Sequence, residues 1–249
     1  MNKFPVCPIF IPANRLEWVE KTFDKGTDAV IIDLEDSVPK EQKDETRTKL
    51  FSYIDSHDFE KTILIRVNPV EGEFGKEDMK ILSEVSSKID AFMLPKIEQT
   101  ELLNDLPDNL IALIETPKSI QNLEEIASHK NVIGIALGGA DLSVSLGSDM
   151  SWDSLLFTRS KIIIEAAANN LFTIDSPFMN IEDISSLKNE SVLSNGLGFD
   201  GKAAIHPNQI ETITKSFLPN ESDIQEAKEI IKLFNSSSEA VIAYKGKMI

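Results

Sequence analysis

AVIIDLED, residues 29–36, is the stretch that decides the fold. Four consecutive apolar residues are followed by acidic and apolar positions, and the acidic ones include Asp33, Glu35 and Asp36. A short run that is apolar on both faces is typical of a strand buried on both sides, as in a parallel sheet. The sequence therefore predicts a buried strand here with acidic residues at its carboxyl end.

Similar apolar runs recur along the chain and alternate with amphipathic, charged stretches such as residues 153–170, whose apolar positions have helical spacing. Seven further runs have strand length: residues 8–13, 63–68, 91–96, 110–116, 132–139, 172–178 and 202–206. Strands alternating with helices predict right-handed βαβ crossovers and a parallel sheet. Eight strands in 249 residues, with no G-x-G-x-x-G turn after the first, favour a single-domain (β/α)8 TIM barrel over a doubly wound open sheet.

We expect the barrel, an α/β fold, to occupy residues 1–220 and a C-terminal helix and tail to occupy residues 221–249. Ser222 with Gln225 has the spacing of a capping box that would open this helix, and Asn14 with Glu17 has the same spacing near the N-terminus.

Composition excludes several classes of partner. A formal net charge of −16 disfavours nucleic acid and anionic membranes. One cysteine rules out an internal disulfide, and the single cysteine with only three dispersed histidines disfavours a Cys/His zinc site. No apolar run is long enough to span a bilayer, and residues 1–10 lack the features of a signal peptide. We therefore expect a cytoplasmic protein.

Polar residues collect where the predicted strands end: Asp33, Glu35, Asp36, Arg66, Asn68, Lys96, Glu115, Asp141, Asp175 and His206. Any one of them is more commonly a helix cap or a solvated loop residue than a catalyst, and for Glu35 capping and function are equally good interpretations. Barrel closure, however, brings these ends to one rim, which is where barrel enzymes place their chemistry.

Several carboxylates in a small site need a cation among them. Oxygen ligands without a Cys or His cluster indicate Mg²⁺, with Mn²⁺ as a second candidate. Glu115 and Asp141, on adjacent predicted strands, supply the one or two carboxylates that Mg²⁺ takes. Gly138 and Gly139 would let the backbone approach a ligand closely. Arg66 suits a substrate carboxylate or a developing enolate oxygen.

At these positions the chain resembles the citrate lyase β-subunit-like (CitE-like) family of the HpcH/HpaI aldolase/citrate lyase superfamily. The motifs follow in the family's order: FIPANR (10–15), AVIIDLEDSV (29–38), RVN (66–68), LPK (94–96), ALIET (112–116), GADL (139–142), TRS (158–160) and GFDGKAAIHP (198–207). Each motif is weak alone, and together they are specific.

The resemblance implies that Glu115 and Asp141 bind Mg²⁺ and that Arg66 binds substrate oxygens. It also implies a 2-oxo acid and an acyl thioester of coenzyme A or an acyl-carrier protein as small-molecule partners. The expected reaction is cleavage or formation of a citryl-, malyl- or citramalyl-type thioester. Asp36 is the candidate general acid or base, because related aldolases carry a histidine near this position.

Four further residues receive roles as expectations. Asp33 and Glu35 would hold metal-bound water, Arg15 would contact a phosphate, and Lys96 would bind substrate. The resemblance also implies a homo-oligomer, with a trimer favoured, in which the C-terminal segment packs on a neighbouring subunit.

Two alternatives stay open. One is a Schiff-base aldolase that uses Lys96 or Lys202, although Glu115 and Asp141 would then have no task. The other is a non-catalytic or altered barrel that binds Mg²⁺ and an oxo acid. Residues 244–249 motivate it, because they resemble a family segment that continues into an aspartate used in proton transfer in a neighbouring subunit's site, and here the sequence ends one residue before that position.

Overall fold

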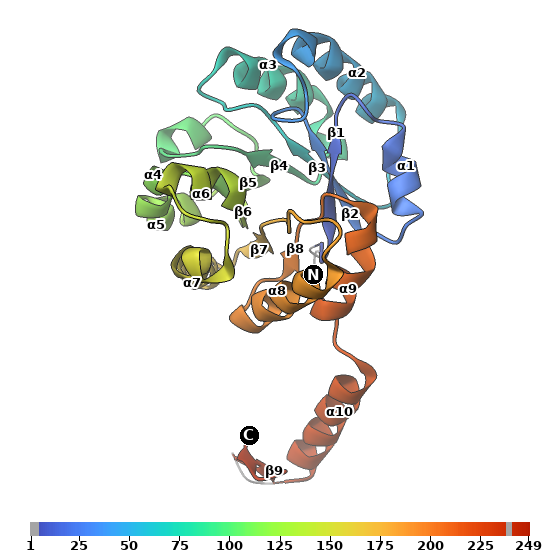
Figure 1. Cartoon of the computed structure of the whole chain (residues 1–249), viewed down its shortest axis with the longest axis vertical. Coiled ribbons are helices and arrows are strands. Elements are labelled where there is room, and N and C mark those ends of the chain that lie inside the picture. Colours follow the sequence, from blue (N-terminus) through green and yellow to red (C-terminus); the bar gives the residue numbers. More distant parts are fainter. Residues whose placement is uncertain (1–4, 238–240) are drawn as a thin grey trace. The chain divides into compact units, whose positions relative to one another are not determined.

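Parallel strands hydrogen-bonded in chain order form the centre of the fold of residues 5–217 (Figure 1). The computed structural model describes residues 5–237 and 241–249. Within residues 5–237 the parallel strands are β1 (Pro8–Pro12), β2 (Ala29–Asp33), β3 (Thr62–Arg66), β4 (Ala91–Leu94), β5 (Leu110–Ile114), β6 (Val132–Leu137), β7 (Phe172–Asp175) and β8 (Gly201–Lys202). Two hydrogen bonds join the last strand region to the first, from Phe10 N–H to the Ala204 carbonyl at 2.9 Å and from Ala204 N–H to the Pro8 carbonyl at 2.8 Å. The predicted (β/α)8 barrel is confirmed.

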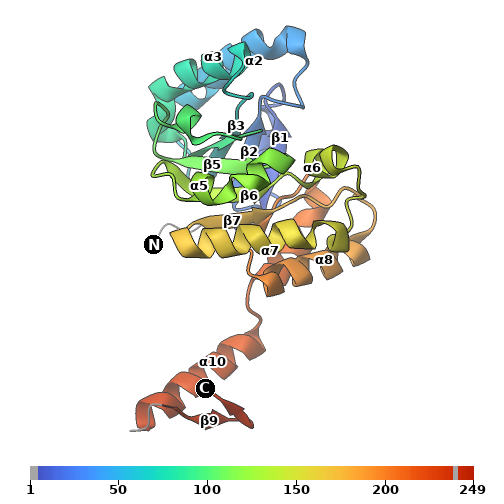
Figure 2. The ribbon, with the colours of Figure 1, turned by 90° about the vertical axis from the view of Figure 1, so that its left-hand side faces the viewer.

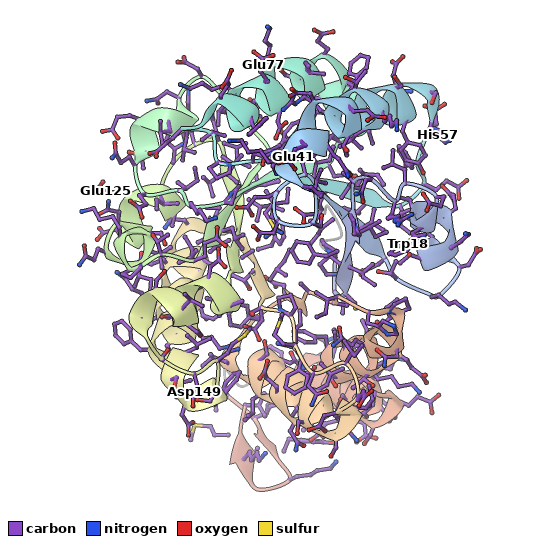
Figure 3. The ribbon with its side chains drawn as sticks, turned by 45° about the horizontal axis from the view of Figure 1, so that its top comes forward. Trp18, Glu41, His57, Glu77, Glu125 and Asp149 are labelled. Carbon is purple, nitrogen blue, oxygen red and sulfur yellow. The ribbon has the colours of Figure 1, made fainter. Side chains whose placement is uncertain are left out.

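Helices cover the outside of the strands, and Figure 2 shows α7 running along the outside of β6 and β7. The helices of residues 5–217 are α1 (Trp18–Phe23), α2 (Lys43–Ser56), α3 (Glu73–Leu82), α4 (Pro117–Gln121), α5 (Leu123–Ala127), α6 (Gly139–Leu146), α7 (Trp152–Asn169), α8 (Ile184–Leu197) and α9 (Ile210–Phe217). Short 3₁₀ helices lie at Lys40–Gln42, Ser83–Lys88, Thr100–Leu103 and Pro207–Gln209. Charged side chains such as Glu77 and Glu125 lie at the outer edge (Figure 3).

Strand side chains alternate between the barrel interior and the helix layer, because successive side chains of a strand point to opposite faces. Ile31, Leu64 and Leu113 belong to the interior cluster, whereas residues before and after them in the same strands pack in the larger cluster shared with the helices. The residues two positions further on are Asp33, Arg66 and Glu115. The alternation therefore delivers these three charged side chains to the interior face at the carboxyl ends of β2, β3 and β5.

The same alternation turns Asp175 and Lys202 outward, because their neighbours Ile174 and Ala203 occupy the interior. Asp175 Oδ1 accepts from Arg159 Nε at 2.9 Å, and Asp175 Oδ2 accepts from Lys202 Nζ at 2.9 Å. Lys202 also contacts Glu190 Oε1 at 2.7 Å. Arg159, Asp175 and Lys202 are fully buried, so two cations and two carboxylates balance each other between the strands and α7 and α8.

Two predicted capping boxes are wrong. Glu17 is itself the N-cap of α1, and no side-chain hydrogen bond caps that helix. The helix near the C-terminus, α10 (Glu221–Ser236), is capped by Asn220 with Asp223 rather than by Ser222 with Gln225. The pairs Asn220 with Asp223 and Ser222 with Gln225 both have the three-residue spacing of a capping box. Asn220 is the N-cap because the backbone enters the helix after it. The helix predicted at residues 153–170 is confirmed as α7, with Asn170 in the left-handed conformation at its end.

The chain divides into two units, Met1–Phe217 and Leu218–Ile249. The second unit contains α10 and an antiparallel hairpin of β9 (Ala243–Tyr244) and β10 (Lys247–Met248). Packing of this unit on a neighbouring subunit remains a prediction. None of the described helices is both long and apolar enough to cross a membrane. Residues 1–4, on which the argument against a signal peptide partly rests, lie outside the described residues.

Candidate active site

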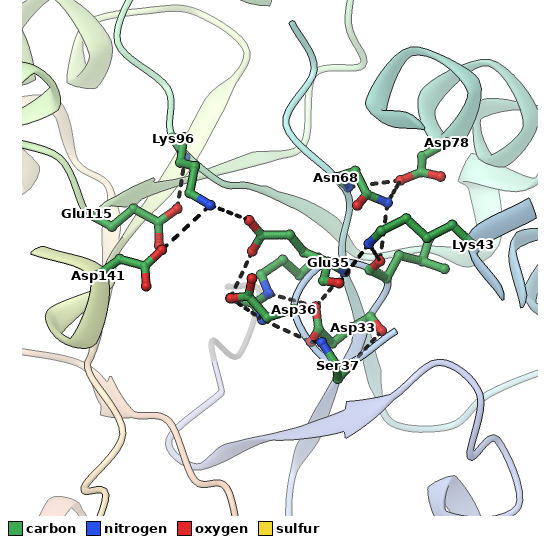
Figure 4. Close-up of polar contacts among 12 residues, drawn as sticks. Asp33, Glu35, Asp36, Ser37, Lys43, Asn68, Asp78, Lys96, Glu115 and Asp141 are labelled. Atoms are coloured by element: carbon green, nitrogen blue, oxygen red, sulfur yellow. Dashed lines mark hydrogen bonds and ion pairs between the residues drawn. The ribbon is translucent and has the colours of Figure 1, made fainter. Parts of the chain in front are cut away.

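A cavity of about 400 Å³ opens at the carboxyl ends of the strands. Its charged lining residues are Asp33, Asp36, Arg66, Glu115, Asp141 and Asp175. Of these residues, Asp33, Asp36, Arg66, Glu115 and Asp141 therefore meet at one cavity, with Arg66 as the cation among them, whereas the Asp175 carboxylate is turned into the helix layer toward Arg159 and Lys202. Figure 4 shows that Glu35 and Lys96 join the group from its rim.

Arg66 is held by Asp33 in a two-pronged ion pair. Arg66 Nε donates to Asp33 Oδ1 at 2.7 Å, and Nη2 donates to Asp33 Oδ2 at 2.9 Å. Burial works to raise the pKa of Asp33, but the hydrogen bonds and charge of Arg66, with the hydrogen bonds from Ser37 and Glu35, together outweigh it and lower that pKa. Asp33 also accepts the backbone N–H groups of Glu35 and Ser37. The Asp33 carboxylate thus orients the Arg66 guanidinium and also fixes the backbone of the loop that follows β2.

Glu35 does not cap a helix in this structure. Its buried side chain accepts from Lys96 Nζ at 2.8 Å and lies 3.2 Å from Arg66 Nη1. Lys96 Nζ also lies 3.6 Å from Asp141 Oδ2. Partial burial works to lower the pKa of Lys96, but the hydrogen bond to Glu35 and the negative charges of Glu35, Glu115 and Asp141 together outweigh it and raise that pKa. Lys96 is therefore a charged bridge between Glu35 and Asp141 (Figure 4).

The carboxyl group of Glu115 has a pKa far above its ordinary value. Burial, together with the nearby Glu35 and Asp141, raises its pKa to about 8. Its Oε1 accepts the backbone N–H of Lys96 at 3.0 Å. A left-handed backbone at Lys96, with φ 56°, brings that N–H to the carboxylate. Among the described residues no hydrogen-bond donor is assigned to Oε2, and Glu115 lines the cavity.

Gly138 and Gly139 make room for neighbouring side chains, and their close approach to a ligand remains a prediction. A Cβ atom at Gly138 would lie 2.4 Å from Glu115 Cβ and 2.6 Å from Glu115 Oε2. A Cβ atom at Gly139 would lie 2.7 Å from Ser176 Oγ. The absence of these side chains makes room for Glu115 and for the start of α6, which carries Asp141.

Gly138→Ala is expected to displace the Glu115 carboxylate and weaken Mg²⁺ binding by about tenfold or more, since misplaced ligand groups cost that much. Gly196→Ala in α8 is the matched control, because a Cβ atom there meets nothing within 4 Å. Isothermal titration calorimetry with Mg²⁺ measures the affinity of each variant. Equal affinity in both would contradict the assigned role of Gly138.

The donor set at this rim fits Mg²⁺. Two carboxylates, Glu115 directly after β5 and Asp141 of α6, line the same cavity, and burial together with neighbouring carboxylates raises the pKa of Glu115. Mg²⁺ takes one or two protein carboxylates and completes its octahedron with water and substrate oxygens. Within the described residues no group of three or more His, Cys, Asp or Glu side chains could hold a metal, so a dedicated protein cage is absent there.

The remaining predicted residues lie in different places. Asp36 is exposed, lines the cavity and has Oδ2 3.4 Å from Arg66 Nη2. Arg15 lies outside this cavity in a separate polar hollow, where it pairs with Glu17. His206 is exposed and caps the 3₁₀ helix that follows it. The phosphate contact of Arg15 remains a prediction.

Several lining residues were not found by sequence reasoning. The Phe10 ring lies 5.1 Å from the Arg66 guanidinium carbon, and Met150 and Met179 line the cavity from loops. Strand alternation could have indicated Phe10, because it lies between Ile9 and Ile11 of the helix-facing cluster. Nothing in the sequence marks the two methionines.

A closed parallel barrel whose charged side chains gather at the carboxyl ends of its strands is the arrangement of a TIM-barrel enzyme. Residues 7–207 match the HpcH/HpaI aldolase/citrate lyase family, and the chain belongs to this family. The resemblance seen in the sequence motifs is thereby confirmed.

Two curated relatives and one crystal structure illustrate the range of the family. The citrate lyase subunit beta of Haemophilus influenzae is 31% identical over 265 residues, covering 97% of this chain and 90% of the relative. The (3S)-malyl-CoA thioesterase of Cereibacter sphaeroides is 30% identical over 254 residues, which cover 97% of this chain and 88% of the relative. Mycobacterium tuberculosis CitE in complex with magnesium, acetoacetate and coenzyme A superposes with a TM-score of 0.84 at 28% identity, covering 100% of this chain and 93% of that one.

Proposed function

We propose that this chain is a Mg²⁺-dependent carbon–carbon lyase that cleaves or forms a citryl-, malyl- or citramalyl-type thioester. The products of cleavage are an acyl thioester and a 2-oxo acid. The observation that carries the proposal is the convergence of Arg66 and the Glu115–Asp141 pair on one cavity. The magnesium, acetoacetate and coenzyme A in the CitE crystal structure support it.

Glu115 and Asp141 would hold the metal ion, with Mn²⁺ as a second candidate. When bound, the ion supplies positive charge to the oxygens of the 2-oxo acid. Lys96 keeps the carboxylate pair in place through its backbone N–H and its side chain. Asp33 holds Arg66, and Glu35 holds Arg66 and Lys96. We propose in addition that both carboxylates hold metal-bound water.

Cleavage requires that the substrate hydroxyl lose its proton as the carbon–carbon bond breaks. Asp36 is the proposed base, since it lines the cavity without burial. The hydroxyl oxygen becomes the carbonyl of the 2-oxo acid, and the electron pair of the broken bond moves to the thioester, which becomes an enolate. Arg66 is preorganised by Asp33 to stabilise that negative charge. Protonation of the enolate carbon then gives the acyl thioester.

A Schiff-base aldolase is disfavoured by the state of both lysines. An amine nucleophile must be unprotonated. The pKa of Lys96 is raised by Glu35, and Lys202 is buried between Asp175 and Glu190, outside the barrel interior. Neither lysine offers a free amine to the cavity.

The carrier of the acyl group is proposed to be coenzyme A or an acyl-carrier protein, in a cytoplasmic homo-oligomer, with a trimer favoured. The excess of acidic residues over basic ones gives no basic face for nucleic acid or membrane.

The proposal is tested by incubating the full chain with citryl-, malyl- and citramalyl-CoA, with Mg²⁺ or with EDTA. We expect Mg²⁺-dependent release of a 2-oxo acid and an acyl thioester from at least one substrate. Release of free coenzyme A without carbon–carbon cleavage would indicate a thioesterase instead. Tight binding of Mg²⁺ and an oxo acid without turnover would favour a non-catalytic barrel.

Mg²⁺ affinity is expected to rise with pH. A metal-ligand carboxyl must lose its proton, and the pKa of Glu115 is raised to about 8. The apparent affinity should therefore increase by up to about tenfold per pH unit below about pH 8 and level off above it. Calorimetry in two buffers of different ionisation enthalpy measures the released proton. An affinity that does not change between about pH 6 and 9 would contradict the assignment of Glu115.

A further inference from the structure

The cavity wall has two chemically different parts. Strands β2 to β6 and the loops after them contribute the charged residues. The part formed by β7, β8 and their loops is apolar apart from Ser176 and Asp175, and its members include Ile174, Pro177, Met179, Ala203 and Ile205. A substrate held by the charged part therefore places its remaining substituent against apolar side chains.

The cationic side chains of Arg66, Lys96 and Lys202 lie in or beside the cavity wall, and each already has a carboxylate partner. Arg66 is engaged by Asp33, and Lys96 by Glu35. Lys202 lies behind the apolar wall, fully buried, with Asp175 and Glu190 as its partners. Among the described side chains that line the cavity, Arg66 is the one cation, and its outer edge lies near Asp36.

These two observations limit the charge of the oxo acid. A divalent cation at Glu115 and Asp141 would balance that pair, and its remaining coordination positions, together with the outer edge of Arg66, would take the oxygens of one substrate carboxylate. A second carboxylate would lie on an apolar wall or beside Asp36, without a cation. Like-charge contacts and unpaired buried charges both oppose binding.

We propose that the site selects a 2-oxo monocarboxylate of the pyruvate type, with a small apolar substituent, over a dicarboxylate of the oxaloacetate type. This inference rests on the proposed function and makes the citramalyl-type thioester the favoured substrate. The methyl group lies against the wall of Ile174, Met179 and Ile205. One buried methyl group favours pyruvate over glyoxylate by about fourfold.

Calorimetric titration of the full chain with pyruvate, glyoxylate and freshly prepared oxaloacetate, in saturating Mg²⁺, tests this selection. We expect pyruvate to bind about tenfold or more tightly than oxaloacetate, because the second carboxylate has no cationic partner. We expect kcat/KM for citramalyl-CoA to exceed kcat/KM for citryl-CoA by a similar factor.

Met179→Arg adds a cation to the apolar wall at a half-exposed position where the longer side chain has room. It is expected to raise the affinity for oxaloacetate relative to pyruvate by about tenfold. Met179→Gln, of similar size and without charge, is the matched control and should leave oxaloacetate weaker than pyruvate.

Oxaloacetate binding as tightly as pyruvate in the unchanged protein, or an equal response to both Met179 variants, would overturn the inference. The proposed lyase function would survive that result if citryl-CoA were cleaved. Conversely, pyruvate-selective binding without cleavage of any thioester would support the inference and reject the lyase.

Discussion

Glu115→Gln and Asp141→Asn are each expected to abolish measurable Mg²⁺ binding and to lower kcat/KM for the thioester by at least about a thousandfold. Glutamine and asparagine keep the size of the side chain and remove the negative charge that a hard cation requires. Because the two carboxylates are the only protein ligands proposed, loss of either one leaves too little negative charge at the site. Calorimetry with Mg²⁺ and steady-state kinetics provide the two measurements.

Glu125→Gln is the control for the chemical change itself, since Glu125 lies in α5 at the outer edge of the barrel (Figure 3). It should leave metal binding and turnover unchanged. Circular dichroism must show that all three variants are folded. The metal assignment fails if Glu115→Gln and Asp141→Asn bind Mg²⁺ as the unchanged protein does.

The barrel was predictable because its strands are buried on both faces, so that each one is a short apolar run in the sequence. The same runs also contain the information about side-chain direction. In β7, Ile174 points into the interior, so Asp175 must point into the helix layer. Asp175 was grouped with the rim residues because its position at a strand end was considered and its alternation was not.

Contacts between residues far apart in the chain could not be read from the sequence. The bond from Lys96 N–H to Glu115 depends on a left-handed backbone conformation at Lys96, which no local residue pattern demands. The Arg66–Asp33 pair depends on the strand register, in which Asp33 of β2 lies beside Arg66 of β3. Motif order located these residues, whereas their mutual distances required the folded chain.

The C-terminal hairpin was also missed. Lys245 and Gly246 both have positive φ, at 47° and 79°, as a two-residue type I′ turn requires. A lysine followed by glycine is a weaker turn signal than asparagine followed by glycine, and the paired strands are only two residues long each.

Lys202→Met is expected to destabilise the barrel by about 3–5 kcal/mol, the usual cost of removing one partner from a buried ion pair. Lys202 Nζ donates to Asp175, to Glu190 and to the backbone carbonyl of Ser176, so all three of its N–H groups are used. Methionine is similar in length and apolar, so the variant removes the charge with little change in volume. Urea unfolding followed by circular dichroism measures the free energy of unfolding.

Lys215→Met is the matched control, because Lys215 pairs with Glu211 on the exposed surface of α9. Exposed pairs of this kind contribute about 0.3–0.5 kcal/mol. A loss for Lys202→Met no larger than for Lys215→Met would show that the buried cluster does not stabilise the fold.

The loss of unfolding free energy in Lys202→Met should come mainly from the unbalanced negative charge left on Asp175 and Glu190, and less from the lost attraction between these groups and Lys202. Without Lys202, Asp175 and Glu190 share Arg159 alone, and two Arg159 nitrogens already lack a hydrogen-bond acceptor among the described residues. Burial works to raise the pKa of Asp175, but Lys202 and Arg159 outweigh it and lower that pKa. The stability that this carboxylate contributes is therefore present above its ordinary pKa and is lost as the pH falls through the lowered value.

Replacing Glu190 by Leu together with Lys202→Met restores the balance of charge, and we expect the double variant to unfold at a higher urea concentration than Lys202→Met alone. If it is less stable than the single variant, each ion contributes by its own contacts, and balance of charge is not what holds β7 and β8 to α7 and α8.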